Sequence, residues 1–208
     1  MRCGRSAWSI VSGPAGALPL TGTLVAQGGN GEADAELCER LRDWQPELIG
    51  TLMFVLDPPR VLLIDKKTGH GAGKVNAPGG KLETGESPAQ CAEREVYEEV
   101  GIRVAGVRLL AEFKFVDTHW EQWYGYAFVA REHAGVPTET PEARPFWCDL
   151  GALPFERMWE DNRIWIPLIL PTSEARAIGA DQQLFGEFLF TRGKLLAHRC
   201  YVRSAACE

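Results

Sequence analysis

The sequence predicts an α/β fold in which helices sandwich a mixed β-sheet. Short apolar runs rich in β-branched and aromatic residues recur along the chain between turn residues, as strands do. Residues 88–100 instead carry the end signals of a helix. Ser87 and Gln90 form a capping box, Pro88 suits the first turn, and Gly101 stops the helix.

The strands follow from the apolar runs in chain order. Residues 51–56 and 60–65 predict a hairpin that turns at Asp57-Pro58-Pro59. Residues 109–116 and 122–130 are rich in aromatics and predict a second pair of strands. The remaining expected elements are a strand at 144–150, a helix that starts near 162, and a terminal hairpin over 184–202 that turns at Arg192-Gly193.

Residues 1–48 differ in composition and are predicted to be a disordered or loosely packed extension before a domain at 49–205. The first 30 residues or so are rich in Gly, Ala and Ser, with no acidic residue before Glu32. An organellar transit peptide and a poor secretory signal fit the same pattern. We expect a cytoplasmic protein, with organellar targeting as the alternative. Residues 35–43 are compatible with a short helix.

The charge balance and the cysteines argue against several functions. A formal net charge of −6 disfavours binding to nucleic acid through a broad basic surface, although a single nucleotide needs only a local patch. No apolar stretch is long enough to predict a transmembrane helix or a membrane partner. The six cysteines lack the spacing of a zinc site and are expected to be reduced. We expect a monomer.

Three carboxylates on the predicted helix point to a divalent metal. Glu95 and Glu99 lie one turn apart on one face, with Glu98 beside them, so their charges repel unless a cation lies between them. Magnesium, or manganese, takes such oxygen ligands together with substrate phosphates. Arg94 can hold one of the glutamates. The alternative for such a run is a solvated acidic helix face.

The complete spacing resembles a known family signature. Residues 80–102, GKLETGESPAQCAEREVYEEVGI, match the box of Nudix hydrolases at every defined position. The resemblance implies the Nudix α/β/α sandwich and hydrolysis of a nucleoside diphosphate linked to another group. It also implies that Arg94 belongs to the catalytic site and that Glu98 or Glu142 is the base. The implied metal ligands are Glu95, Glu98, Glu99, Glu142 and the carbonyl groups of Gly79 or Gly80.

Segments outside the box, over residues 51–203, resemble the oxidised purine nucleoside triphosphatases of the 8-oxo-dGTP diphosphatase type. In this family an asparagine, acidic residues and aromatic side chains form the base pocket. Two positions depart from the family pattern: its second acid is Asn162 here, and an aromatic in the Gly-x-Gly loop is His70. The implied substrate-binding residues are Asn76, Phe113, Trp159, Asp161 and Asn162, with Thr51 and Lys66 at the rim of the base pocket.

The predicted function is therefore hydrolysis of oxidised purine nucleoside triphosphates, with Mg²⁺ or Mn²⁺, to the monophosphate and pyrophosphate. Such an enzyme cleans the nucleotide pool. One alternative is a Nudix hydrolase of a dinucleotide or sugar nucleotide, and another is a Nudix-like nucleotide sensor without catalysis. The sequence leaves open which modified base is preferred and whether the sugar is ribose or deoxyribose.

Overall fold

The computed structural model describes residues 22–171, 178–179 and 181–204. In these residues the first half of the chain forms β1 (Thr23–Gly28), α1 (Gly31–Arg40), β2 (Leu48–Asp57), β3 (Arg60–Lys66), β4 (Val75–Asn76), α2 (Pro88–Val100) and β5 (Arg103–Ala105). The second half forms β6 (Arg108–Asp117), β7 (Trp123–Ala130), β8 (Glu132–Ala134), β9 (Ala143–Asp149), the 3-10 helix η1 (Phe155–Arg157), α3 (Asn162–Ile169), β10 (Gln182–Thr191) and β11 (Lys194–Ser204).

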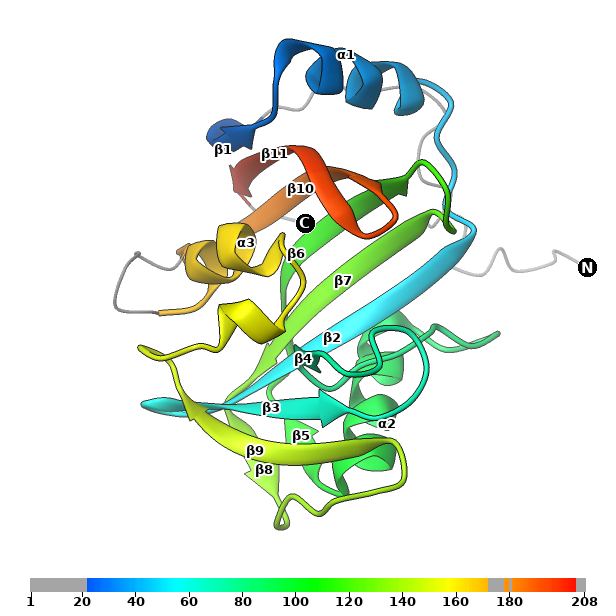
Figure 1. Ribbon diagram of the computed structural model, residues 1–208. Coiled ribbons are helices and arrows are strands. Elements are labelled where there is room, and N and C mark those ends of the chain that lie inside the picture. Colours follow the sequence, from blue (N-terminus) through cyan, green and yellow to red (C-terminus); the bar gives the residue numbers. More distant parts are fainter. Residues whose placement is uncertain (1–21, 172–177, 180, 205–208) are drawn as a thin grey trace, which may run out of the picture.

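The main sheet is mixed, as predicted. Its strands lie in the order β1-β11-β10-β6-β7-β2-β3-β4, and β9 also pairs with β3 (Figure 1). The pairs β10/β6 and β2/β7 are parallel, whereas the predicted hairpins β2/β3, β6/β7 and β10/β11 are antiparallel. The last hairpin turns at Arg192 and Gly193, where φ is positive at both residues (51° and 77°).

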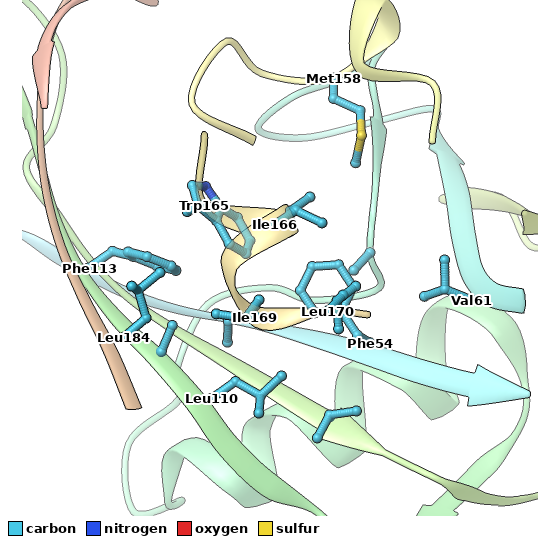
Figure 2. Close-up of a cluster of buried hydrophobic side chains, with 14 of the residues drawn as sticks. Phe54, Val61, Leu110, Phe113, Met158, Trp165, Ile166, Ile169, Leu170 and Leu184 are labelled. Carbon is cyan, nitrogen blue, oxygen red and sulfur yellow. The ribbon is translucent and has the colours of Figure 1, made fainter. Parts of the chain in front are cut away.

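Helices cover both faces of this sheet. On one face, Trp165 and Ile166 of α3 are fully buried against Phe54 and Phe113 of the strands (Figure 2). On the opposite face, Val96 of α2 belongs to a second buried cluster with residues of β2 and β3. Burying large apolar side chains on both faces supplies the main stabilisation of such a sandwich. The predicted fold class is confirmed.

Residues 23–40 pack on the main sheet and do not form the loosely packed extension that was predicted. Strand β1 pairs with β11 from Thr23 to Gly28, which makes it an edge strand of the main sheet. Helix α1 is capped by the side chain of Asn30, which accepts a hydrogen bond from the Ala33 amide at 2.8 Å. Leu37 of α1 is fully buried against residues of β6, β10 and β11. The prediction is wrong for these residues, while residues 1–21 lie outside the described part.

Two further expectations concern the described part of the chain. None of its helices combines the length and the apolar character needed to cross a membrane. Its cysteines are free thiols: Cys38, Cys91, Cys148 and Cys200. Burial of Cys91 in α2 raises the pKa of its thiol to about 12. This thiol therefore stays protonated inside the protein.

Candidate active site

A cavity of about 410 Å³ opens beside strands β2 and β7. Its walls come from the β3–β4 loop, the β4–α2 loop, β6, and the segment that enters α3. Predicted site residues from distant parts of the sequence line this cavity together: Thr51, Lys66, Asn76, Gly79, Gly80, Glu95, Phe113, Glu142, Trp159, Asp161 and Asn162. Arg94, Glu98 and Glu99 are not among the residues that line it.

The glycine loop before α2 passes unusually close to its neighbours. The Thr51 amide donates a hydrogen bond to the Gly80 carbonyl at 2.9 Å. A Cβ atom at Gly79 would lie 2.0 Å from the Thr51 carbonyl oxygen, and one at Gly80 would lie 2.3 Å from the Glu95 carboxylate. Only glycine fits at position 79, where the clash would be with backbone atoms, whereas a side chain at position 80 would displace the Glu95 carboxylate.

Glu99 is fully buried and its carboxylate is already engaged. One oxygen accepts a hydrogen bond from the Lys66 ammonium at 2.6 Å, and the other accepts from the Gly79 amide at 2.9 Å. Lys66 lines the cavity, but its partner is this carboxylate. It is therefore part of the carboxylate end of the cavity, whereas the sequence placed it at the rim of the base pocket.

Arg94 lies at the centre of a network of glutamates. Its guanidinium donates to Glu95 at 2.8 Å, to Glu98 at 2.9 Å, and to both carboxylate oxygens of Glu86 at 2.7 and 3.0 Å. The hydrogen bonds from Arg94 lower the pKa of Glu86 to about 2. The sequence predicted one glutamate partner and did not assign Glu86 to the site. Arg94 orders the acidic helix face and partly neutralises it.

The acidic cluster has the character of a cation site. Burial raises the pKa of Glu95, and the charges of Glu99 and Glu98 raise it further, against the effect of Arg94. Within the described residues, no three acidic, cysteine or histidine side chains stand ready as a metal centre. The carboxylates of Glu95, Glu98 and Glu99 instead accept hydrogen bonds from Lys66, Gly79 and Arg94. The hard oxygen donors and their mutual repulsion fit a divalent cation that displaces these partners.

The other end of the cavity is aromatic and polar. Trp159 lines it, followed by Asp161 and Asn162, which are 4% and 2% exposed. The Asp161 carboxylate accepts a hydrogen bond from the Trp165 indole at 2.7 Å. Burial raises the pKa of Asp161 to about 6. The side-chain nitrogen of Asn162 is buried and has no hydrogen-bond partner among the described residues.

Three other predicted pocket residues have different environments. Phe113 is 1% exposed, and its ring centroid lies 4.6 Å from that of Trp165, so it forms the floor of the cavity and belongs to the core. Thr51 is also buried, with its hydroxyl 3.3 Å from the Cys91 sulfur, and does not form an exposed rim. Asn76 is half-buried, and its side-chain oxygen accepts from the Ala77 amide at 2.9 Å.

Two further residues that line the cavity, Trp123 and Asp117, were not predicted from the sequence. Trp123 begins β7 and lines the cavity. Asp117 accepts hydrogen bonds from the amides of His119 and Trp120 at 2.8 and 3.1 Å, and from the Gly193 amide at 3.3 Å. It therefore ties the β6–β7 loop to the β10–β11 turn. Neither role has a local signal, because an aromatic at a strand start and an aspartate at a strand end are both common.

Comparison with known proteins identifies the class of this protein. Residues 46–169, more than half of the chain, match the model of the NUDIX domain. The chain therefore belongs to the Nudix family, whose members generally use divalent metals.

Two relatives of known name and one solved structure are similar to this chain. The oxidized purine nucleoside triphosphate hydrolase of Danio rerio is 41% identical over 128 residues, covering 58% of this chain and 78% of that protein. The protein of the same name from Mus musculus is 42% identical over 122 residues, with the same coverage of each chain. Among solved structures, the MutT protein of Bacillus halodurans aligns with a TM-score of 0.60 and 30% identity, covering 74% of this chain and 97% of that one.

Proposed function

We propose that this protein is a divalent-metal-dependent hydrolase of oxidised purine nucleoside triphosphates of the 8-oxo-dGTP type. The reaction yields the nucleoside monophosphate and pyrophosphate and removes damaged nucleotides from the pool. One observation carries the proposal. A single cavity is lined by Glu95 and the glycine loop of the Nudix box and also by Trp159, Asp161 and Asn162. A nucleotide has the same two-ended chemistry, and the relatives bear the matching name.

The carboxylate end of the cavity holds the metal and the phosphates. We assign the metal to Glu95, Glu98 and Glu99 with a carbonyl oxygen of Gly79 or Gly80, and Mg²⁺ is the ion that best suits carboxylate ligands combined with phosphate. When bound, the ion neutralises phosphate oxygens and lowers the pKa of a coordinated water. If Glu99 held an ion in place of Lys66, the Lys66 ammonium, which lines the cavity, would be available as a partner for a phosphate oxygen.

A carboxylate that faces the cavity takes the proton from the attacking water. Glu142 lines the cavity, as Glu95 does, and its backbone amide donates a hydrogen bond to the Thr140 hydroxyl at 3.3 Å. Glu98 lies outside the lining, and Arg94 neutralises its carboxylate at 2.9 Å. This difference favours Glu142 as the general base and leaves Glu98 as a ligand.

The aromatic end of the cavity binds the base. An indole such as that of Trp159 gains roughly 1–3 kcal/mol by stacking on a purine. The buried amide nitrogen of Asn162 lacks a partner among the described residues and can donate to an acceptor on the base edge. Asn76 uses its oxygen on the chain itself, which leaves its amide nitrogen for the ligand. Asp161 supplies a carboxyl group whose raised pKa lets it donate or accept near neutral pH.

Product analysis tests the proposed reaction. Purified protein is incubated with 8-oxo-dGTP and Mg²⁺, and the phosphorus-containing products are identified by ³¹P NMR. The proposal requires the monophosphate and pyrophosphate in equal amounts, and no reaction when EDTA replaces Mg²⁺. Release of inorganic phosphate, or turnover only of dinucleotides or sugar nucleotides, would rule it out. The variant Glu95→Gln is the control for a contaminating phosphatase, because that activity would survive the substitution.

A further inference from the structure

The loop between β3 and β4 has the construction of a lid. Its base is fixed by hydrogen bonds from the Lys66 amide to the Lys74 carbonyl at 3.0 Å and from the Lys67 amide to the Glu142 carbonyl at 2.8 Å. Within its tip the glycines at 69, 71 and 73 all have positive φ, at 70°, 82° and 85°. We call residues 67–74 the lid loop. Its alternating glycines adopt a backbone conformation that other residues disfavour, and the tip is closed by hydrogen bonds from the Ala72 amide to the Gly69 carbonyl at 3.2 Å and from the Lys74 amide to the Gly71 carbonyl at 3.0 Å.

One side chain of the lid loop, His70, reaches across the mouth of the cavity. Its ring centroid lies 5.2 Å from that of Trp159, with 15° between the ring planes, and 5.0 Å from that of Trp123, with 34° between the planes. The imidazole makes no hydrogen bond to the described residues, so these two ring contacts hold it. Other lid atoms also approach Trp159, because the Lys74 ammonium lies 4.7 Å from its ring centroid.

The two tryptophans belong to opposite ends of the site. Trp159 precedes Asp161 and Asn162 at the base end. Trp123 lies near the carboxylate end, where a Cβ at Gly50 would be 3.0 Å from its ring and the Lys81 ammonium is 5.4 Å from its centroid. His70 therefore spans the cavity between the base end and the phosphate end.

We propose that His70 clasps the lid loop shut between Trp123 and Trp159, and that the purine base displaces it from Trp159 when substrate binds. The inference rests on the proposed function in one respect, because it takes Trp159 as the ring on which the base stacks. In the free protein that ring already contacts His70 and Lys74. Binding therefore exchanges one stacked ring for another, and the closed lid lowers the apparent affinity for substrate.

The charges around the clasp make it sensitive to acid. Burial lowers the pKa of His70, and Lys81 and Lys66 lower it further, while Glu121 opposes them. Lys74 adds a further cation on the lid loop itself. The closed lid therefore prefers the neutral imidazole, and protonation opens it. The closed state is most populated above the ordinary pKa of histidine and is lost as the pH falls through the lowered pKa.

NMR of the imidazole groups tests the clasp without any turnover. The ring currents of two indoles should displace the His70 ring protons upfield in the free protein, with His70→Ala identifying the signal among the four histidines. The displacement should shrink in Trp159→Ala and on addition of 8-oxo-dGMP. An undisplaced signal in the free protein would refute the clasp. A signal that stays displaced when nucleotide is bound would show that His70 is a fixed wall of the site.

Kinetics test the competition. Loss of the ring in His70→Ala should lower KM for 8-oxo-dGTP roughly two- to tenfold with kcat unchanged, which is the range expected for one or two aromatic contacts. The KM of the wild type should fall at acid pH, where His70 is protonated. His70→Phe should keep the high KM at every pH, because phenylalanine cannot be protonated. The matched control is His133→Ala, which removes another histidine–tryptophan pair, with Trp147 at 5.3 Å, and should leave KM unchanged. A higher KM in His70→Ala would overturn the proposal. If no purine triphosphate is hydrolysed, the proposed function fails, while the NMR result for the free protein still decides the clasp.

Discussion

Replacing Glu99 by glutamine should separate the two roles of this carboxylate. In the free protein it is fully buried and neutralises the Lys66 ammonium at 2.6 Å. In the proposed enzyme it is a metal ligand. The substitution keeps the shape and lets the Gly79 amide keep an oxygen acceptor, but it removes the charge. Stability and turnover should therefore both fall, by different mechanisms.

The stability cost follows from the burial of the pair. Breaking a fully buried ion pair costs about 3–5 kcal/mol. The Lys66 side chain retains 15% of its exposure and lines the cavity, so water can solvate it after the substitution. We therefore expect about 1–2 kcal/mol, which lowers Tm by roughly 2–8 °C for a domain of this size. The loss of one charged metal ligand should lower kcat by about 10²–10³-fold.

A double variant distinguishes the two effects. Lys66→Met combined with Glu99→Gln replaces both partners of the ion pair, so the Tm should recover most of its loss. Activity should not recover, and should fall below the level of Glu99→Gln, because Lys66→Met also removes the proposed partner of a phosphate oxygen. Thermal melting and Mg²⁺-dependent turnover of 8-oxo-dGTP are measured on the same preparations. If Glu99→Gln retained its rate within about threefold, which is well under 1 kcal/mol in the barrier, Glu99 would not be a metal ligand and the site as drawn would be wrong.

Three further predictions concern the fold and the base pocket. Leu37→Ala should cost about 2–4 kcal/mol in the free energy of unfolding without changing KM, because Leu37 of α1 is fully buried and no residue of its cluster lines the cavity; an unchanged urea midpoint would show that this side chain adds nothing to the fold. Burial raises the folded-state pKa of Asp161 from 3.8 to about 6, so its stabilising contribution is present below pH 4 and lost as the pH rises through about 6. Asp161→Asn should therefore match the wild type at pH 4 and exceed its stability by about 1–3 kcal/mol at pH 7.5. Equal denaturation curves for the two proteins at both pH values would contradict this. Asn162→Asp replaces an unpartnered buried donor by an acceptor, so the ratio of kcat/KM for 8-oxo-dGTP to that for 2-oxo-dATP should change by about tenfold or more; an unaltered ratio would place Asn162 outside base recognition.

The sequence predicted best what local chemistry decides. The capping box at Ser87 and Gln90 forms with hydrogen bonds of 2.8 and 3.1 Å, and Gly101 ends α2 with φ at 76°. The spacing of Glu95, Glu98 and Glu99 also follows from helix geometry alone. These features depend on neighbours in the chain, so a single sequence is enough to place them.

What the sequence could not predict depends on contacts between distant residues. Strand β1 is mostly exposed and has no strong apolar pattern, so its place in the sheet comes from backbone pairing with β11. The pairing of Lys66 with Glu99 joins residues 33 positions apart and requires the end of β3 to meet α2. Likewise, His70 meets Trp123 and Trp159 only after the lid loop has folded over the cavity.

Base discrimination tests the central claim most directly. Values of kcat/KM are measured with Mg²⁺ for 8-oxo-dGTP, 2-oxo-dATP and O6-methyl-dGTP, and for dGTP and dATP as matched unmodified substrates. The account predicts at least about a tenfold preference, or about 1.4 kcal/mol, for one modified purine over its unmodified counterpart, because the buried groups of Asp161 and Asn162 are left unpaired by the wrong base. Equal values for every modified and unmodified pair would contradict it, and would show that the cavity binds nucleotides without reading the base.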